Sequence, residues 1–108
     1  MTLQDLKWSP GEKKIARKAF DKAYKKEMAQ IRSVVFERIK ESSEENDVWR
    51  LHDYLTKKRK EVDRKYDYRY SVLIWVFAGL IRDGLISMED LQGLSDEKTS
   101  AIKTLLDL

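Results

Sequence analysis

The stretch SPGEKKIARKAFDKAYKKEMAQIRSVVFERIKES, residues 9–42, decides the fold. It opens with Ser9, Pro10 and Glu12, the residue types of a helix start with a capping box and a proline at the first helical position. Apolar residues then recur at steps of mostly three or four, which is the period of an amphipathic helix. They are Ile15, Ala19, Phe20, Ala23, Tyr24, Met28, Ile31, Val35 and Ile39. The sequence therefore predicts one uninterrupted helix from Pro10 to about Ser42.

This helix is too long for a compact domain made of the same chain. About 33 residues that rise 1.5 Å each span roughly 50 Å. A compact chain of 108 residues has a diameter of about 34 Å. The helix must therefore project from the body of the protein. Its apolar stripe then needs a returning helix, a second subunit, or both to cover it.

A second helix is expected over residues 48–66, after a short polar connection. Asn46 or Asp47 can cap it. Its seam repeats at alternating steps of four and three residues, the rhythm of helices that pack side by side. The seam residues are Val48, His52, Leu55, Arg59, Val62 and Tyr66. Because the connection is so short, this helix is predicted to return antiparallel to the first.

The remaining residues predict a small group of helices. A third helix is expected over residues 68–83, and because it is apolar nearly all round it should be buried. Gly84 marks its end, since glycine commonly occupies the position after a helix terminus. Two short helices should follow, one beginning at Ser87 and the other at Ser95, both of which can act as N-caps.

The predicted fold class is therefore all-α, with the chain 1–108 forming a single domain. We expect residues 1–66 to form an extended stalk of two long antiparallel helices, and residues 67–108 to form a small helical head. The two parts differ in charge: residues 1–69 carry 19 basic and 13 acidic side chains, whereas residues 70–108 carry 3 basic and 6 acidic ones. This asymmetry indicates that the two parts serve different purposes.

The residue types exclude most catalytic and metal chemistry. The chain has no cysteine and one histidine, His52, so thiolate sites and multi-histidine zinc sites cannot form. The glycines and serines form neither a phosphate-binding loop nor a nucleophile elbow. We expect no enzyme activity, metal, cofactor or small-molecule substrate. The N-terminus lacks the apolar core of a secretory signal, and the longest apolar run, Val72–Ile81, is about half of a membrane span, so we expect an intracellular protein without a transmembrane segment.

The basic first part allows nucleic-acid binding as one hypothesis, since lysine and arginine clusters neutralise phosphates. The clusters comprise Lys13, Lys14, Arg17, Lys18, Lys22, Lys25 and Lys26 in the first helix and Lys57–Lys60 with Arg64 and Lys65 in the second. These side chains alternate with acidic ones, and neither a recognition helix nor a base-stacking aromatic pair is present. The pattern is more typical of a solvated helix face, and we do not expect nucleic acid to be the partner.

A protein-binding face is the other hypothesis. Trp49, His52 and Asp53 are spaced i, i+3 and i+4, so a helix brings them to one side. Tryptophan and arginine beside polar groups are typical of interface hot spots. Alternatively, Trp49 and His52 pack inside a dimer seam while Asp53 pairs with Lys57, and composition alone favours this second interpretation.

Two runs of sequence resemble a known family. They are WRLHDYLTKKR, residues 49–59, and VDRKYDYR, residues 62–69, and they resemble the signature of the fluorescence recovery protein family. The similarity extends to Trp8-Ser9, to residues 20–27 and 71–78, and into the C-terminal residues up to Lys103. It covers nearly the whole chain in register, with many matches of rare residue types.

The resemblance implies an all-helical homodimer that acts in cyanobacterial photoprotection without a cofactor. The implied partner is the orange carotenoid protein, bound in its red form and largely through its C-terminal domain. Binding would accelerate return to the orange form, end quenching and restore phycobilisome antenna fluorescence. The implied location is the cytoplasm, or the cytoplasmic side of the thylakoid membrane. The alternative function is a helical dimeric adaptor for another partner, with basic-patch binding to nucleic acid third.

The resemblance also implies which residues act. The partner-binding residues would be Trp49, Leu51, His52, Asp53, Lys58 and Arg59 in the second helix, with Trp75 and Leu105 forming a second contact surface in the head, beside Ala101. The dimer interface would include Val35, Ile39, Val48 and Leu55. Ala101 stands where the family has a basic residue, so the sequence departs from the family at this surface.

Overall fold

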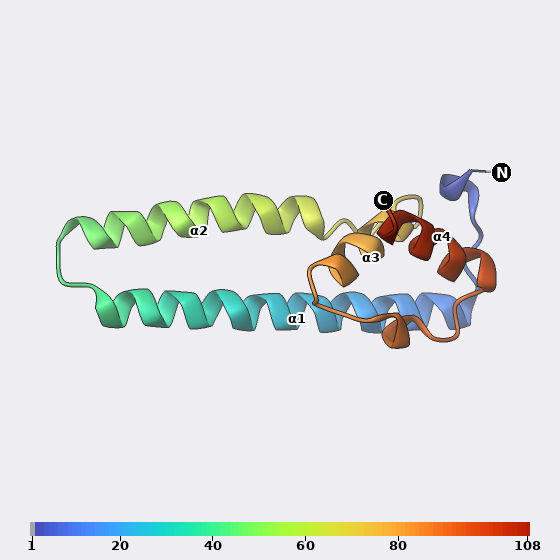
Figure 1. The fold of residues 1–108 in the computed structure, drawn as a ribbon, viewed down its shortest axis with the longest axis horizontal. Helices are drawn as coiled ribbons and strands as arrows, with labels where there is room; N and C mark the ends of the chain where they lie inside the picture. The colour runs from blue at the N-terminus through green and yellow to red at the C-terminus, as the bar shows by residue number, and fades with distance from the viewer. Residues whose placement is uncertain (1) are drawn as a thin grey trace.

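The computed structural model describes residues 2–108, which form an elongated all-helical molecule measuring 55 × 25 × 22 Å (Figure 1). A single turn of 3-10 helix, η1, precedes the helices that build the fold. In chain order the elements are η1 (Leu3–Asp5), α1 (Pro10–Glu41), α2 (Asn46–Lys65), α3 (Leu73–Arg82), η2 (Met88–Leu91) and α4 (Asp96–Leu106). No β-strand occurs within the described residues, and the predicted all-α class is confirmed.

The start of α1 is the capping box that the sequence predicts. The Glu12 N–H donates to Ser9 Oγ at 3.1 Å, and the Ser9 N–H donates to Glu12 Oε1 at 3.0 Å. The helix then runs without a break to Glu41, one residue short of the predicted end. Its second half projects beyond the head alongside α2 and forms one edge of the stalk (Figure 1).

The turn at the stalk tip is held by Asp47, whose carboxylate accepts the N–H groups of Ser43 and Glu44 at 3.1 Å each. These two donors lower the pKa of the Asp47 carboxyl. The helix α2 begins at Asn46, two residues earlier than predicted, and returns antiparallel to α1 (Figure 1). Near the tip the Arg38 guanidinium lies over the Tyr54 ring, 4.4 Å from its centre, and joins the two helices.

The head has a hydrophobic core to which both ends of the chain contribute. Its fully buried side chains include Leu73, Ile74, Phe77, Leu80, Leu91 and Ile102. Against them pack Leu6 and Trp8 from the N-terminal segment and Ala16, Ala19, Phe20 and Ala23 from α1. Assigning residues 1–66 to the stalk therefore gives too small a head. The alanines lie on one side of α1, and their small side chains let other elements approach this helix closely.

The predicted start of the third helix is wrong. The helix α3 begins at Leu73 instead of residue 68, and irregular chain connects it to α2. Aromatic contacts hold this connection: the Tyr68 ring packs edge-on against Phe20 at 4.8 Å, and Tyr70 packs against Trp8 at 5.7 Å between ring centres. These tertiary contacts hold residues 68–72 outside a helix. Hydrophobic periodicity along the sequence could not predict them.

The other helix ends follow the prediction more closely. After α3, Gly84 has a φ of +73°, the Gly84 N–H donates to the carbonyl of Ile81, and the Leu85 N–H donates to that of Leu80. This is the Schellman arrangement for which glycine is favoured. The Ser87 helix is the single turn of η2, and Ser95 caps α4.

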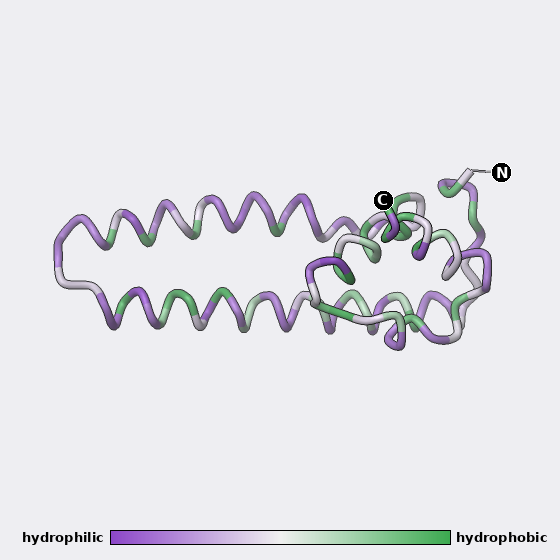
Figure 2. Tube along the Cα trace, viewed as in Figure 1, coloured by the Kyte–Doolittle hydropathy of each residue, from purple (hydrophilic) through white to green (hydrophobic). Residues whose placement is uncertain are grey.

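Hydrophobic residues are spaced along α1 and concentrated in the head, whereas α2 is predominantly hydrophilic (Figure 2). Within residues 2–108, no helix combines the length and the apolar character that crossing a membrane requires.

Candidate partner-binding face

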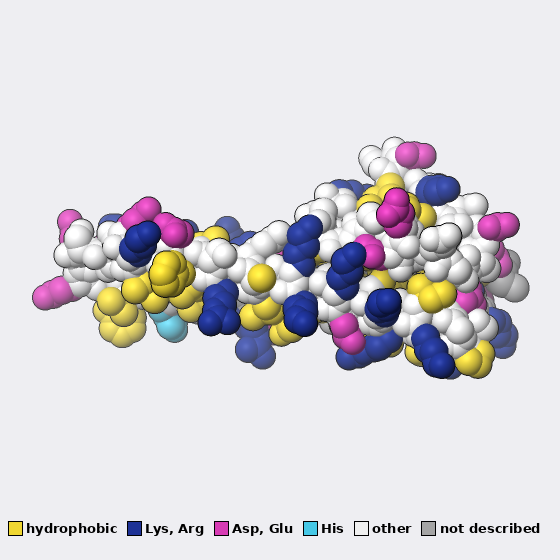
Figure 3. Space-filling model, turned by 90° about the horizontal axis from the view of Figure 1, so that it is seen from below, with side chains coloured by type: hydrophobic (Ala, Val, Ile, Leu, Met, Phe, Trp, Pro, Cys, Tyr) yellow, Lys and Arg dark blue, Asp and Glu magenta, His cyan; other side chains and the backbone are white. Residues whose placement is uncertain are grey.

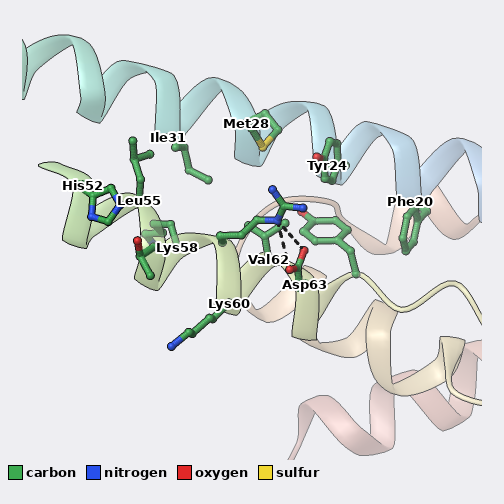
Figure 4. Close-up of a pocket in the computed structure, with 13 residues that line it drawn as sticks. Phe20, Tyr24, Met28, Ile31, His52, Leu55, Lys58, Lys60, Val62 and Asp63 are labelled. Atoms are coloured by element: carbon green, nitrogen blue, oxygen red, sulfur yellow. Dashed lines mark hydrogen bonds and ion pairs between the residues drawn. The ribbon is translucent and has the colours of Figure 1, made fainter.

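A groove runs along the stalk where α1 and α2 lie side by side (Figure 4), with a volume of about 790 Å³. From α1 it is lined by Phe20, Tyr24, Met28 and Ile31, and from α2 and its end by His52, Leu55, Thr56, Lys58, Arg59, Lys60, Val62, Asp63 and Tyr66. The α1 wall is apolar, whereas α2 contributes most of the charged groups. The groove can therefore accept an apolar side chain against α1 and an acidic group at its α2 edge.

The structure brings three of the predicted partner-binding residues to this groove: His52, Lys58 and Arg59. Trp49 lies one turn before His52, with its ring edge-on to that of His52 at 6.3 Å between centres. It is 65% exposed, so a large aromatic surface borders the groove without a cover from the chain itself. This is the composition of a protein-binding hot spot rather than of a packed core.

Asp53 and Leu51 lie apart from the groove lining. The Asp53 carboxylate is exposed, and its Oδ1 lies 3.7 Å from His52 Nδ1. Among the described residues, neither an ion pair nor a hydrogen bond joins Asp53 to Lys57, the partner expected if Asp53 had only a structural role. Leu51 is half-buried.

Arg59 is held by Asp63, which sequence reasoning missed. The Arg59 Nε donates to both carboxylate oxygens of Asp63 at 3.2 Å (Figure 4). The i, i+4 spacing of an arginine and an aspartate on one helix could have indicated this pair. Both side chains stay largely exposed, so Asp63 orients the guanidinium while solvent and a partner can still reach it. Lys58 also has an acidic neighbour on α2, since its Nζ lies 3.2 Å from Glu61 Oε2.

Sequence reasoning also missed Tyr24, Met28 and Thr56 as lining residues. Tyr24 and Met28 belong to the apolar stripe of the first helix, which we expected to be covered. Both are exposed, because α2 covers only one side of that stripe.

The second predicted contact surface lies in the head. Trp75 on α3 is exposed, whereas Leu105 and Ala101 on α4 are half-buried. The Leu105 carbonyl accepts a hydrogen bond of 2.9 Å from Arg82 Nη2, which ties the end of α4 to the end of α3. None of the three residues lines the stalk groove.

The predicted dimer residues are uncovered within the single chain. Ile39 and Val48 are 60% and 61% exposed, Leu55 is also exposed, and Val35 is half-buried. Hydrophobic side chains gather near the stalk tip beside the only histidine (Figure 3). A group of large apolar residues at one end of an otherwise charged stalk is the kind of surface that another protein covers.

Comparisons with known proteins agree with this architecture. The family model described as photoprotection regulator fluorescence recovery protein matches residues 8–106. The fluorescence recovery protein of Synechocystis sp. PCC 6803 is 42% identical over 101 residues, which cover 94% of this chain and 93% of that protein. This chain belongs to the fluorescence recovery protein family.

Solved structures of fluorescence recovery proteins have the same fold. The protein from Fremyella diplosiphon is 42% identical with a TM-score of 0.89, and the match covers 94% of this chain and all of that one. The protein from Synechocystis sp. PCC 6803 is 41% identical with the same TM-score and the same coverage. The family identity makes the chain a photoprotection regulator, and the resemblance of residues 49–69 is confirmed.

Proposed function

We propose that this photoprotection regulator acts as a homodimer that binds the red, photoactivated form of the orange carotenoid protein, largely through the C-terminal domain of that partner. Binding accelerates return to the orange form, which ends quenching and restores phycobilisome fluorescence. The observation that carries the proposal is the uncovered aromatic and basic face at the groove, where Trp49, His52 and Arg59 lie within the family's signature region. The expected place of action is the cytoplasm, or the cytoplasmic side of the thylakoid membrane.

The proposed action is non-enzymatic, because no covalent bond is made or broken. A protein can accelerate the rejoining of two domains only by binding the closing arrangement more tightly than the open one. The groove supports this role in two ways. Trp49 provides apolar contact area, and Arg59, oriented by Asp63, provides a charged contact that favours one orientation of the partner.

The function is tested by mixing the protein with photoactivated orange carotenoid protein in the dark and following the decay of red absorbance. We expect the natural chain to accelerate the decay at substoichiometric amounts. Trp49→Ala should reduce this acceleration by roughly tenfold or more, the usual effect of removing an interface hot spot. Phe36→Ala is the matched control, since Phe36 is also aromatic and 65% exposed, but among the described residues it makes no ring contact such as the one that joins Trp49 to His52 of the groove.

Light scattering must first show that each variant keeps the oligomeric state of the natural chain. No acceleration by the natural protein would contradict the proposed partner. Equal losses in Trp49→Ala and Phe36→Ala would contradict the assignment of the groove as the contact face.

A further inference from the structure

A polar cluster lies where the stalk meets the head, and we call its residues Glu27, Lys65, Tyr66 and Asp83 the joint. Lys65 Nζ donates to Glu27 Oε1 and Oε2 at 2.9 and 3.0 Å and also lies 3.0 Å from Asp83 Oδ2. The Tyr66 hydroxyl donates to Glu27 Oε1 at 3.0 Å. The joint thereby connects the middle of α1, the end of α2 and the residue that directly follows α3.

The joint is unlike the charged pairs that lie within α1 or within α2. Arg59–Asp63 and Arg17–Asp21 are exposed pairs within one helix, so they hold no two elements together. Glu27 is only 7% exposed, and a carboxylate is buried in this way only when cations and hydrogen-bond donors compensate for its lost hydration. Buried polar pairs contribute little net stability but can select one arrangement of the elements that carry them.

Aromatic packing also helps to fix the end of α2 on α1. The Tyr66 ring lies edge-on to Phe20 at 5.4 Å and to Tyr24 at 5.2 Å between ring centres. The end of α2 is therefore fixed on α1 by two aromatic contacts and by hydrogen bonds to Glu27. The first half of α1 is itself part of the head core, so the element whose position the joint fixes relative to the head is α2. Beyond α2, the chain up to α3 contains no regular helix that could fix α2 by itself. In addition, Lys26 Nζ donates to the carbonyl of Gly84 at 2.8 Å.

We propose that Glu27, Lys65 and Tyr66 are positioning residues: they hold α2 in one fixed orientation relative to α1 and the head, so that a single partner protein contacts the stalk groove and the exposed head surface around Trp75 at once. The proposal rests on the proposed function. The joint proposal deepens the proposed function, because it requires the partner to contact two surfaces at once. Such a contact depends on a fixed distance between the stalk groove and the head surface. Once the partner is bound at one surface, the effective concentration of the second contact depends on how narrowly the connection fixes its position.

The orientation can be measured in the protein alone. Because the chain has no cysteine, Lys57→Cys on α2 and Ser100→Cys on α4 accept two spin labels specifically. Doubly labelled chains diluted into excess unlabelled protein report distances within one chain by pulsed electron paramagnetic resonance. We expect one narrow distance peak for the natural joint and the loss of that narrow peak in Glu27→Gln. Glu37→Gln, an exposed site on the same helix, is the matched control and should keep it.

The consequence for activity is measured in the red-to-orange assay at saturating amounts of each variant. We expect Glu27→Gln to lower the maximal acceleration by about tenfold, which corresponds to about 1.4 kcal/mol, while Glu37→Gln stays at the natural value. A variant that is merely partly unfolded recovers the full rate when more protein is added, whereas a loosened joint does not. Tyr66→Phe removes a single hydroxyl and provides a second, milder variant if Glu27→Gln does not fold.

The outcomes separate the joint from the proposed function. If the distance peak stays narrow and unchanged in both Glu27→Gln and Tyr66→Phe, the proposal that the joint fixes the orientation is overturned. A broadened peak with undiminished acceleration overturns its role in partner binding. If the natural protein accelerates nothing, the proposed partner fails, and with it the two-surface contact, while the distance measurement still decides whether the joint fixes α2 relative to the head.

Discussion

Glu12 joins two parts of the head that are far apart in sequence. Its Oε1 completes the capping box of α1, while its Oε2 accepts the Ser95 N–H at 2.9 Å and lies 3.1 Å from Lys98 Nζ. Burial raises the pKa of the Glu12 carboxyl, but the N–H groups of Ser9 and Ser95 and the Lys98 ammonium outweigh burial and lower it to about 2. The same carboxylate thus begins α1 and fixes the start of α4.

This arrangement predicts a loss of stability in acid. The Glu12 pKa is lower in the folded chain than its ordinary value of 4.5, so its contribution is complete above about pH 5 and is lost as the pH falls toward 2. We expect Glu12→Gln to lower the free energy of unfolding at pH 7 by about 2 to 3 kcal/mol, and to weaken its pH dependence between pH 5 and 2. Urea unfolding at several pH values measures both, with Glu37→Gln as control. Natural and Glu12→Gln curves that run parallel down to pH 2 would contradict this account.

For individual residues, the sequence predicts contacts between side chains that are close together along one helix. The capping box at Ser9 and Glu12 and the closeness of Trp49 and His52 follow from spacing along one helix, and the structure contains both. The bonds from Glu12 to residues 83 and 86 positions later could not be predicted, because no local pattern reports a tertiary partner. The family resemblance placed Arg59 in the binding face, and the i, i+4 spacing from Asp63 is the local signal that could have identified the acidic residue that orients it.

At the scale of elements, the helix ends that depend on backbone chemistry are predicted best. The end of α3 at Gly84 follows from the need for a positive φ, whereas the start of α3 does not follow from hydropathy. Residues 66–72 carry helix-compatible apolar residues, yet tyrosine rings directed into the head hold this segment irregular. The extent of the head was underestimated for a related reason, since the apolar stripe of α1 does not reveal which part of it faces the head and which part faces α2.

Replacing either of two glycines at the ends of helical elements by alanine should lower stability, and the two losses should differ in size. Gly84 has a φ of +73° and open space where a Cβ would lie, so Gly84→Ala should cost about 1 kcal/mol from backbone strain alone. Gly93 has a φ of +104°, and a Cβ there would lie 2.6 Å from Ile15 Cδ1, so Gly93→Ala should cost more than Gly84→Ala. Thermal unfolding of the two variants measures the difference. Equal effects, or a larger one at Gly84, would show that the Ile15 contact relaxes without cost.

At the scale of the whole molecule, length alone predicts the shape. A helix of 32 residues is longer than the diameter of a compact chain of this size, and the radius of gyration of 16.9 Å exceeds the roughly 13 Å of a compact domain. The projecting part of α1 is paired with α2 on only one side. The structure of one chain therefore leaves the outer apolar side chains of the stalk in water, at a cost of about 25 cal/mol for each Å² of apolar surface.

A second copy of the chain is the occupant that we expect on this surface, and the oligomeric state tests it. Introducing a charge at Ile39 puts a carboxylate where the partner's apolar side chains would lie, and burying an unpaired charge is strongly unfavourable. We expect light scattering to give twice the chain mass of 12.8 kDa for the natural protein and the monomer mass for Ile39→Glu. The control is Val34→Glu, because Val34 is an exposed aliphatic residue on another side of the same helix. Helical content must stay unchanged in both variants. A dimer that survives Ile39→Glu, or one that Val34→Glu disrupts instead, would place the interface on a different side of the stalk.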